Sequence, residues 1–224
     1  MIPLRDSIRP RRFPVVNVSL IAVNVLVFAY ELALGPKAQD FIQTYGVIPE
    51  RLMNPSFNFG FLPFLTLVTS IFLHGGLLHI VGNMLYLWVF GDNVEDQMGP
   101  VGYLVFYLVS GVVAGLTHVV FNAGSVVPTI GASGAVAGVL GAYFVTFPRA
   151  KVLALFPVSF LLPIVEVRAV YYLAFWFVFQ VFSGLAAIRA GAMAQPIAWW
   201  AHIGGFVVGA ILIKLFRNRS YAMR

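Results

Sequence analysis

Long apolar segments, separated by shorter polar or proline-containing ones, dominate this chain of 224 residues. A membrane-spanning helix needs about 20 mostly apolar residues. Six segments approach that length, and they cover residues 15–34, 77–96, 101–121, 131–147, 169–188 and 197–216. The pattern therefore predicts an all-α membrane protein with six transmembrane helices.

A further apolar segment covers residues 149–163. Its boundaries are marked by Arg149, Lys151, Pro157 and Pro163. Proline lacks a backbone N–H and breaks helices. We therefore predict an interfacial turn here rather than a seventh helix.

The composition agrees with a lipid environment, since 60% of the residues are hydrophobic, only 10% are charged, and the mean hydropathy is +0.91. Such a chain has too little polar surface to face water on all sides. It contains no cysteine, which excludes disulfides, thiol nucleophiles and cysteine metal sites. We expect one helical membrane domain over residues 15–216, between a basic amino-terminal segment, 1–14, and a basic tail, 217–224.

The basic residues indicate how the chain is oriented. If the amino terminus is cytoplasmic, eleven of the fourteen lysines and arginines fall on the cytoplasmic side, and only Lys37, Arg51 and Arg189 fall outside. This positive-inside distribution predicts an even number of spans with both termini cytoplasmic. It also explains the net charge of +6 without a nucleic-acid partner. The lack of a long presequence favours a bacterial plasma membrane.

Four polar residues, Ser133, His79, Asn83 and His202, interrupt the apolar segments. Polar groups at membrane depth are costly and usually functional. In the predicted topology, His79, Ser133 and His202 all lie near the outer ends of the second, fourth and sixth spans. His79 and Asn83 are four residues apart and therefore share a helix face. The four side chains are thus expected at a similar depth, where water can reach them from outside.

The fourth and sixth segments carry small residues at four-residue spacing, which allow membrane helices to approach closely. They are Gly134, Gly138, Gly141 and Ala142 in the fourth segment, and Ala201, Gly205 and Gly209 in the sixth. A close approach shortens the distance from Ser133 to His202. A serine becomes a good nucleophile when an adjacent base removes its proton.

His202 is the candidate base, and Asn83, His79 and the Ser133 amide are candidate donors to an oxyanion. We expect no carboxylate as a third member. Glu31, Asp40 and Glu50 lie in or beside the first outer loop, with no evident link to the site. A serine–histidine dyad is the simpler interpretation.

Three runs of residues resemble the signature motifs of the rhomboid intramembrane serine proteases. They are Gly131-Ala132-Ser133-Gly134, the run from His74 to Asn83, and Ala201-His202-Ile203-Gly204-Gly205 with Gly209. The turn from Gly91 to Gly99, with Glu95 inside it, is similar to that family's cytoplasmic turn after the second span. The motifs occur in the family's order and in the expected segments.

The resemblance implies a six-helix rhomboid-like bundle that cleaves transmembrane segments of single-span or polytopic membrane proteins near their outer ends. By motif match, Ser133 is the nucleophile, His202 is the general base, and His79 and Asn83 assist the oxyanion. No metal, cofactor or nucleic acid is implied, and the residues that bind substrate are not specified. Residues 35–76 correspond to the family's membrane-embedded first loop, here containing Pro36, Pro49, Pro55 and Pro63.

The chain departs from the family pattern in two places. Many members have a tyrosine four residues after the serine, which packs on the catalytic histidine, whereas this chain has Ala137. We expect other side chains or lipid to fill the space beside His202, and Ala137→Tyr to be tolerated. The Trp-Arg pair that many members carry in the first loop is also missing, although Arg51 is nearby.

Three other interpretations stay open. An inactive rhomboid-like protein that binds membrane clients usually lacks the serine or the histidine, whereas both are present here. A transporter with a histidine relay would show charged or broken helices at the midplane. A metal site of His74, His79 and His202 would leave Ser133 unexplained. His118, near the outer end of the third span, is expected to be structural.

Overall fold

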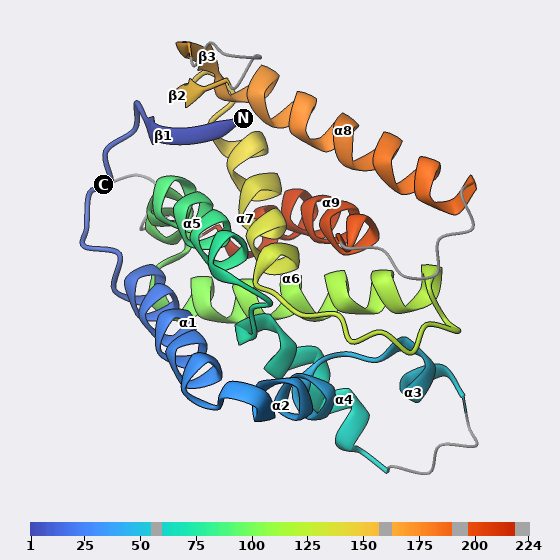
Figure 1. Ribbon diagram of the computed structural model, residues 1–224. Coiled ribbons are helices and arrows are strands. Elements are labelled where there is room, and N and C mark those ends of the chain that lie inside the picture. The colour runs from blue at the N-terminus through green and yellow to red at the C-terminus, as the bar shows by residue number, and fades with distance from the viewer. Residues whose placement is uncertain (55–59, 157–162, 190–196, 218–224) are drawn as a thin grey trace.

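The computed structural model describes residues 1–54, 60–156, 163–189 and 197–217 (Figure 1). Its longer helices are α1 (Val15–Ala33), α5 (Leu77–Met98), α6 (Pro100–Phe121), α7 (Ser133–Thr146), α8 (Ala169–Arg189) and α9 (Trp199–Phe216). The shorter elements between α1 and α5 are η1 (Gly35–Lys37), α2 (Ala38–Tyr45), α3 (Pro49–Met53), α4 (Leu62–Thr69) and η2 (Ser70–Phe72). Pro55, Pro157 and residues 218–224 of the predicted tail lie outside the described residues.

The six predicted segments all contain a helix, but their lengths differ more than the sequence suggested. Within the described part of the chain, α1, α6, α8 and α9 are long and apolar enough to cross a membrane. The α4–η2 segment and α5 count as a fifth span if they are taken together, with an 80° bend between them. Because Pro148 follows soon after its last residue, α7 has only 14 residues. The chain is therefore a mostly helical membrane protein with four or five candidate spans.

Helix α7 lies at the centre of the bundle, with α5, α6, α8 and α9 around it (Figure 1). Every residue from Gly134 to Tyr143 is buried. The predicted close approach of α7 and α9 is confirmed, because the glycines of α9 have no room for a larger side chain. A Cβ atom on Gly209 would lie only 2.0 Å from the carbonyl oxygen of Gly138, and one on Gly205 only 2.1 Å from that of Gly134.

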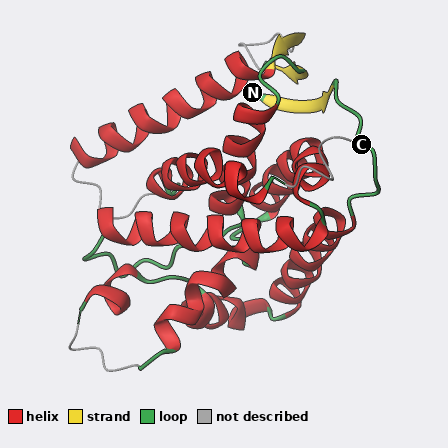
Figure 2. Ribbon diagram, turned by 180° about the vertical axis from the view of Figure 1, so that it is seen from behind, coloured by secondary structure: helices red, strands yellow, loops and turns green. Residues whose placement is uncertain are grey.

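A small antiparallel sheet at one end of the bundle corrects the all-α prediction (Figure 2). Its strands, in the order β1 (Ile2–Asp6), β2 (Lys151–Leu155) and β3 (Ile164–Arg168), pair with Ile2 opposite Leu155 and Lys151 opposite Arg168. The described part of residues 149–163 contains no seventh helix, as predicted, but Lys151–Leu155 form strand β2 rather than an interfacial turn. Buried Val152 and Ala154 alternate with more exposed neighbours, which is the two-residue period of a half-buried strand.

Acidic side chains attach the amino-terminal part of the chain to the bundle. The carboxylate of Glu95 accepts hydrogen bonds from the backbone N–H groups of Val16 and Asn17, at 3.1 and 2.7 Å. It thereby satisfies donors that a helix leaves unpaired at its first turn. Asp6 accepts hydrogen bonds from the hydroxyl of Tyr143 and from the amide of Asn93. Burial raises the pKa of Asp6, and the hydrogen bond from Tyr143 opposes that shift.

Candidate active site

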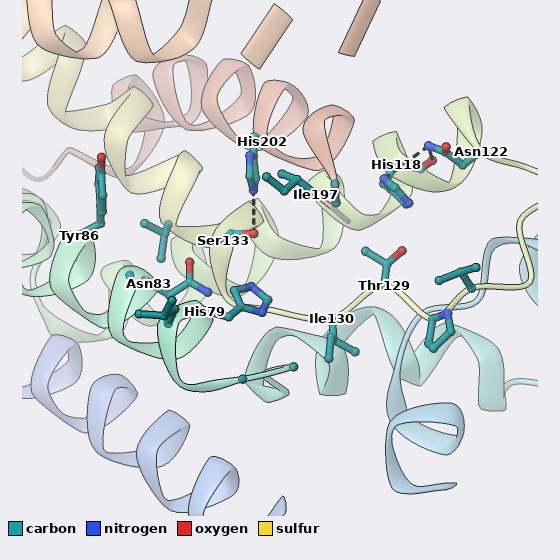
Figure 3. Close-up of a pocket in the computed structure, with 18 of the residues that line it drawn as sticks. His79, Asn83, Tyr86, His118, Asn122, Thr129, Ile130, Ser133, Ile197 and His202 are labelled. Carbon is teal, nitrogen blue, oxygen red and sulfur yellow. Dashed lines mark hydrogen bonds between the residues drawn. The ribbon is translucent and has the colours of Figure 1, made fainter. Parts of the chain in front are cut away.

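The amino-terminal ends of three helices meet at one cavity. His79 is the third residue of α5, Ser133 is the first of α7, and His202 is the fourth of α9. These residues and Asn83 line a cavity of about 890 Å³ (Figure 3). The structure therefore brings together all four side chains that the sequence singled out.

Ser133 and His202 are in direct contact. The Nε2 atom of His202 lies 2.8 Å from the Oγ atom of Ser133 (Figure 3). The contact is possible because the glycines of α7 and α9 allow their backbones to touch one turn further along. This distance is within the range in which an imidazole can remove a hydroxyl proton.

Gln180 of α8 is a site residue that the sequence reasoning missed. Its Oε1 atom lies 2.7 Å from the Nδ1 atom of His202, on the opposite side of the ring from Ser133. Its side chain is buried. Gln180 is a carboxamide, whereas the third member of a serine-protease triad is usually a carboxylate. A signal was nevertheless present, since Gln180 carries the only carboxamide side chain in α8, a long apolar helix.

Two indole rings pack near the imidazole of His202. The ring centroid of Trp176 is 5.8 Å away, and that of Trp199 is 6.3 Å away at an interplanar angle of 87°. Ala137 itself is completely buried. Side chains from α8 and α9 thus supply aromatic packing beside His202, where many family members use a tyrosine at the position of Ala137.

His79 and Asn83 lie across Ser133 from His202 in the close-up view (Figure 3). Gly131 allows His79 to come this near, because a Cβ atom at Gly131 would lie 2.6 Å from the Nε2 atom of His79. Its φ of +124° also favours glycine. The buried Nδ2 atom of Asn83 has no hydrogen-bond partner among the described residues. It is an available donor at the cavity.

The start of α7 adds further donors. Because the helix begins at Ser133, the backbone N–H groups of Ser133, Gly134 and Ala135 have no acceptor one turn earlier in the helix. The first such bond runs from the N–H of Val136 to the carbonyl oxygen of Ala132, at 2.9 Å. A helix amino terminus favours negative charge. An oxyanion beside Ser133 would therefore meet a favourable electrostatic environment.

Glu31 does not contact Ser133, His202, His79 or Asn83 through any described hydrogen bond, but it has an indirect connection to the site that the sequence did not indicate. Glu31 is buried in α1, and its carboxylate oxygens accept from the backbone N–H of His74 at 3.2 and 3.3 Å. The ring of His74 in turn contacts the ring of His79, with centroids 5.1 Å apart. Asp40 and Glu50 are not among the residues that line the cavity.

The alternative metal site of His74, His79 and His202 gains no support from this geometry. Both ring nitrogens of His202 are engaged, one with Ser133 and the other with Gln180. Across the described residues, no three His, Cys, Asp or Glu side chains are grouped as metal ligands would be.

His118 also lines the cavity, and its carbonyl oxygen accepts a hydrogen bond from the side-chain amide of Asn122 at 2.9 Å.

Comparison with known proteins agrees with this arrangement of motifs. Residues 63–219, well over half of the chain, match the family model described as Rhomboid domain. The chain belongs to the rhomboid family. The matched rhomboid region contains Ser133, His202, His79, Asn83 and Gln180.

Similar rhomboid proteins come from several organisms. The chain is 27% identical over 202 residues to Rhomboid protein 1, mitochondrial, of Saccharomyces cerevisiae, a match that covers 86% of this chain and 51% of the yeast protein. It is 30% identical over 198 residues to the human Presenilin-associated rhomboid-like protein, mitochondrial, covering 85% of this chain and 45% of that protein. A shorter match, 42% identical over 76 residues, is to Rhomboid protease GluP of Bacillus subtilis, covering 34% of this chain and 14% of that protein. The chain thus spans about half the length of the yeast and human relatives.

Proposed function

We propose that this rhomboid-family protein is an intramembrane serine endopeptidase that uses Ser133 as nucleophile and His202 as general base. The observation that carries the proposal is the 2.8 Å contact between the Nε2 atom of His202 and the Oγ atom of Ser133 inside a cavity. The substrates are membrane proteins, single-span or polytopic, whose peptide bonds enter this cavity. The word protease in the name of the similar Bacillus protein agrees with this assignment.

The reaction proceeds in two halves. In the first, the Oγ atom of Ser133 attacks the scissile carbonyl carbon while His202 takes the hydroxyl proton, and His202 then gives that proton to the leaving amine. In the second, water attacks the acyl-enzyme ester with His202 as base. This step releases the new carboxyl end and returns the proton to Ser133.

The negative charge that develops on the carbonyl oxygen needs donors aimed at it. Asn83 supplies its Nδ2 group, which has no partner among the described residues, and α7 supplies the backbone N–H of Ser133. His79, which packs against Gly131 just before the nucleophile, completes the set. No metal or cofactor enters these steps.

Six helices with both termini in the cytoplasm are the topology that we propose. The positive-inside distribution of the basic residues supports it, and so does the position of the site at the beginnings of α5, α7 and α9. The site then lies in the outer leaflet, and cleavage occurs near the outer end of the substrate's span. Location in a bacterial plasma membrane stays a prediction, since the matched relatives include mitochondrial and bacterial proteins.

Cleavage of a single-span model protein in liposomes tests the proposal. Ser133→Ala and His202→Ala should each abolish cleavage, and a fluorophosphonate should label the wild type but not Ser133→Ala. Ser110→Ala is the matched control, because Ser110 is another buried serine whose hydroxyl has no partner among the described residues. Full cleavage by Ser133→Ala would overturn the assignment.

The position of the cut tests the proposed topology. Mass spectrometry of the products should place the cut near the substrate's outer end, and cuts at the cytoplasmic end would refute the topology.

Asn83→Ala tests the oxyanion donor in the same assay. Loss of one such donor typically lowers kcat by about 10²- to 10³-fold. Because the amide acts on the transition state, KM should change much less than kcat. An unchanged kcat in a folded Asn83→Ala protein would assign Asn83 a structural role instead.

A further inference from the structure

His202 contacts Gln180 as well as Ser133, and a serine–histidine dyad assigns no role to Gln180. Gln180 comes from α8, whereas Ser133 and His202 come from α7 and α9. Its side chain is only 4% exposed, and its Oε1 atom lies 2.7 Å from Nδ1 of His202. A buried carboxamide in an apolar helix needs partners for both of its polar ends, since an unpaired polar group is costly there.

The two ends of the Gln180 amide have different partners. Its Nε2 group donates to the backbone carbonyl oxygen of Trp176, one turn earlier in α8, at 3.3 Å. A carbonyl oxygen can only accept, so this bond requires the NH₂ end of the amide to face Trp176. The carbonyl end, Oε1, therefore faces the ring of His202.

This orientation determines which nitrogen of His202 carries the proton. Because Oε1 of Gln180 only accepts, the Nδ1 atom of His202 must be the donor in the 2.7 Å contact. A neutral imidazole has one N–H group, so its Nε2 atom then presents a lone pair to Ser133. That is the tautomer that a general base requires. The opposite tautomer would donate to Ser133 and could not accept its proton.

An amide also suits the surroundings better than a carboxylate. Among the described residues, no aspartate or glutamate lines the cavity, and a carboxylate buried at this depth would carry a large desolvation cost. Gln180 is uncharged, yet it offers the same acceptor oxygen to Nδ1. It can fix the ring's orientation while adding no charge.

We propose that Gln180 is a positioning residue, which holds His202 in the Nδ1-protonated tautomer and aims its Nε2 atom at Ser133. The proposal rests on the proposed function, because it assigns a role within that same site. Gln180 touches neither the substrate nor the reacting atoms, and it acts only through His202.

The test measures kcat and KM for cleavage of the single-span model protein by four variants in liposomes. Gln180→Leu keeps the approximate size and removes the acceptor, whereas Gln180→Glu keeps an oxygen at the same reach. Ser183→Ala is the control, because it changes another polar side chain of α8 that has no assigned role in the site. Ser133→Ala defines the background.

Gln180→Leu should lower kcat by at least about 10-fold, toward the roughly 10⁴-fold loss that a wrong histidine tautomer causes in a serine protease. KM and the melting temperature should stay close to those of Ser183→Ala, and the rate of fluorophosphonate labelling should fall in parallel with kcat. Gln180→Glu should recover only part of the lost turnover, because it keeps an acceptor oxygen for Nδ1 of His202 but places a carboxyl group where burial disfavours its charged form.

Wild-type kcat in Gln180→Leu would overturn the proposal, as would a change confined to KM. If Ser133→Ala is inactive while Gln180→Leu is fully active, only the role of Gln180 fails. If Ser133→Ala is active, the proposed function fails and this inference fails with it.

Discussion

Different kinds of residue hold α9 and α8 in the bundle. Glycines make the contact between α7 and α9, whereas larger side chains make the contacts of α8. Glycines place the backbone of α9 directly against that of α7, with no room for a methyl group at Gly205 or Gly209. Side chains make the contacts of α8, where Tyr172, Leu173 and Gln180 are buried. The large apolar side chains of Phe175, Phe179 and Phe182 are exposed on the same helix, which lies at the outer side of the bundle (Figure 1).

The difference separates two requirements of the site. Ser133 and His202 stand at the ends of a helix pair whose spacing is fixed by backbone contact, so their distance is hard to alter without disrupting the fold. Gln180 stands on α8, which makes fewer contacts with the rest of the bundle than α9 does. Segments with few packing contacts move at a lower free-energy cost. The distance between nucleophile and base thus depends on one interface, and the orientation of the base on another.

The largest difference in stability is expected when one methyl group is added to a glycine of α9 and, for comparison, to a glycine of α8. Gly209→Ala places a Cβ atom 2.0 Å from the carbonyl oxygen of Gly138, so the two helices must separate. We expect a loss of about 3 kcal/mol or more in the free energy of unfolding, the upper end for overpacking, together with loss of cleavage. The measurement is the unfolding midpoint in a denaturing-detergent titration.

Gly184→Ala is the matched change in α8. The nearest atoms to its new Cβ, on Trp199 and Trp200, are 3.5 Å away, which is ordinary contact. The free energy of unfolding should change by less than about 1 kcal/mol, and the change should favour the folded state because alanine is the better helix former. Equal losses in Gly209→Ala and Gly184→Ala would remove the distinction between the two interfaces.

A larger side chain at Ala137 tests the same interface from α7. Ala137 is completely buried, and its Cβ atom lies 3.2 Å from the position of a Cβ on Gly205. Ala137→Tyr, which the sequence suggested would be tolerated, is therefore expected to cost about 1–3 kcal/mol and to reduce turnover. Ala186→Tyr, at an exposed position of α8, is the control and should leave the melting temperature unchanged. A stable and active Ala137→Tyr protein would mean that α7 and α9 can separate without penalty.

The sequence was sufficient to find the helices and the four polar residues at the site. The glycine spacing in the fourth and sixth segments predicted the close approach that Gly205 and Gly209 make to α7, because small residues leave a local and direct signal. The positions of the polar residues within their segments were equally informative. His79, Ser133 and His202 all stand at the beginnings of their helices, as the sequence predicted. Such features depend only on residue type and on position within one helix.

Features that depend on contacts between distant segments could not be read in the same way. The strand β1 is paired with β2 across about 150 residues, and neither strand has more than five residues to show a period. Gln180 acts through His202 only because α8 and α9 lie side by side. Glu31 reaches the backbone of His74 through a similar long-range contact, between α1 and the segment before α5.

A smaller loss than at the α7–α9 interface is expected where α8 begins. The hydroxyl of Tyr172 lies 3.0 Å from that of Tyr86 on α5, and 3.4 Å from the carbonyl oxygen of Met1. Tyr172→Phe removes these hydrogen bonds but keeps the buried ring. The hydroxyl of Tyr86 still donates to the carbonyl oxygen of Met1, at 2.9 Å. The free energy of unfolding should therefore fall by about 0.5–1.5 kcal/mol, as for the loss of one typical hydrogen bond.

The neighbouring Tyr171 provides the control, because its side chain is 64% exposed whereas that of Tyr172 is 1% exposed. Tyr171→Phe makes the same chemical change on the outer face of α8 and should leave the unfolding midpoint unaltered. A loss in Tyr172→Phe as large as that in Gly209→Ala would show that α8 is anchored as firmly as α9. Identical midpoints for Tyr172→Phe and Tyr171→Phe would show instead that the hydroxyl contacts between α5 and α8 add nothing to the attachment of α8, which would then rest on apolar packing alone.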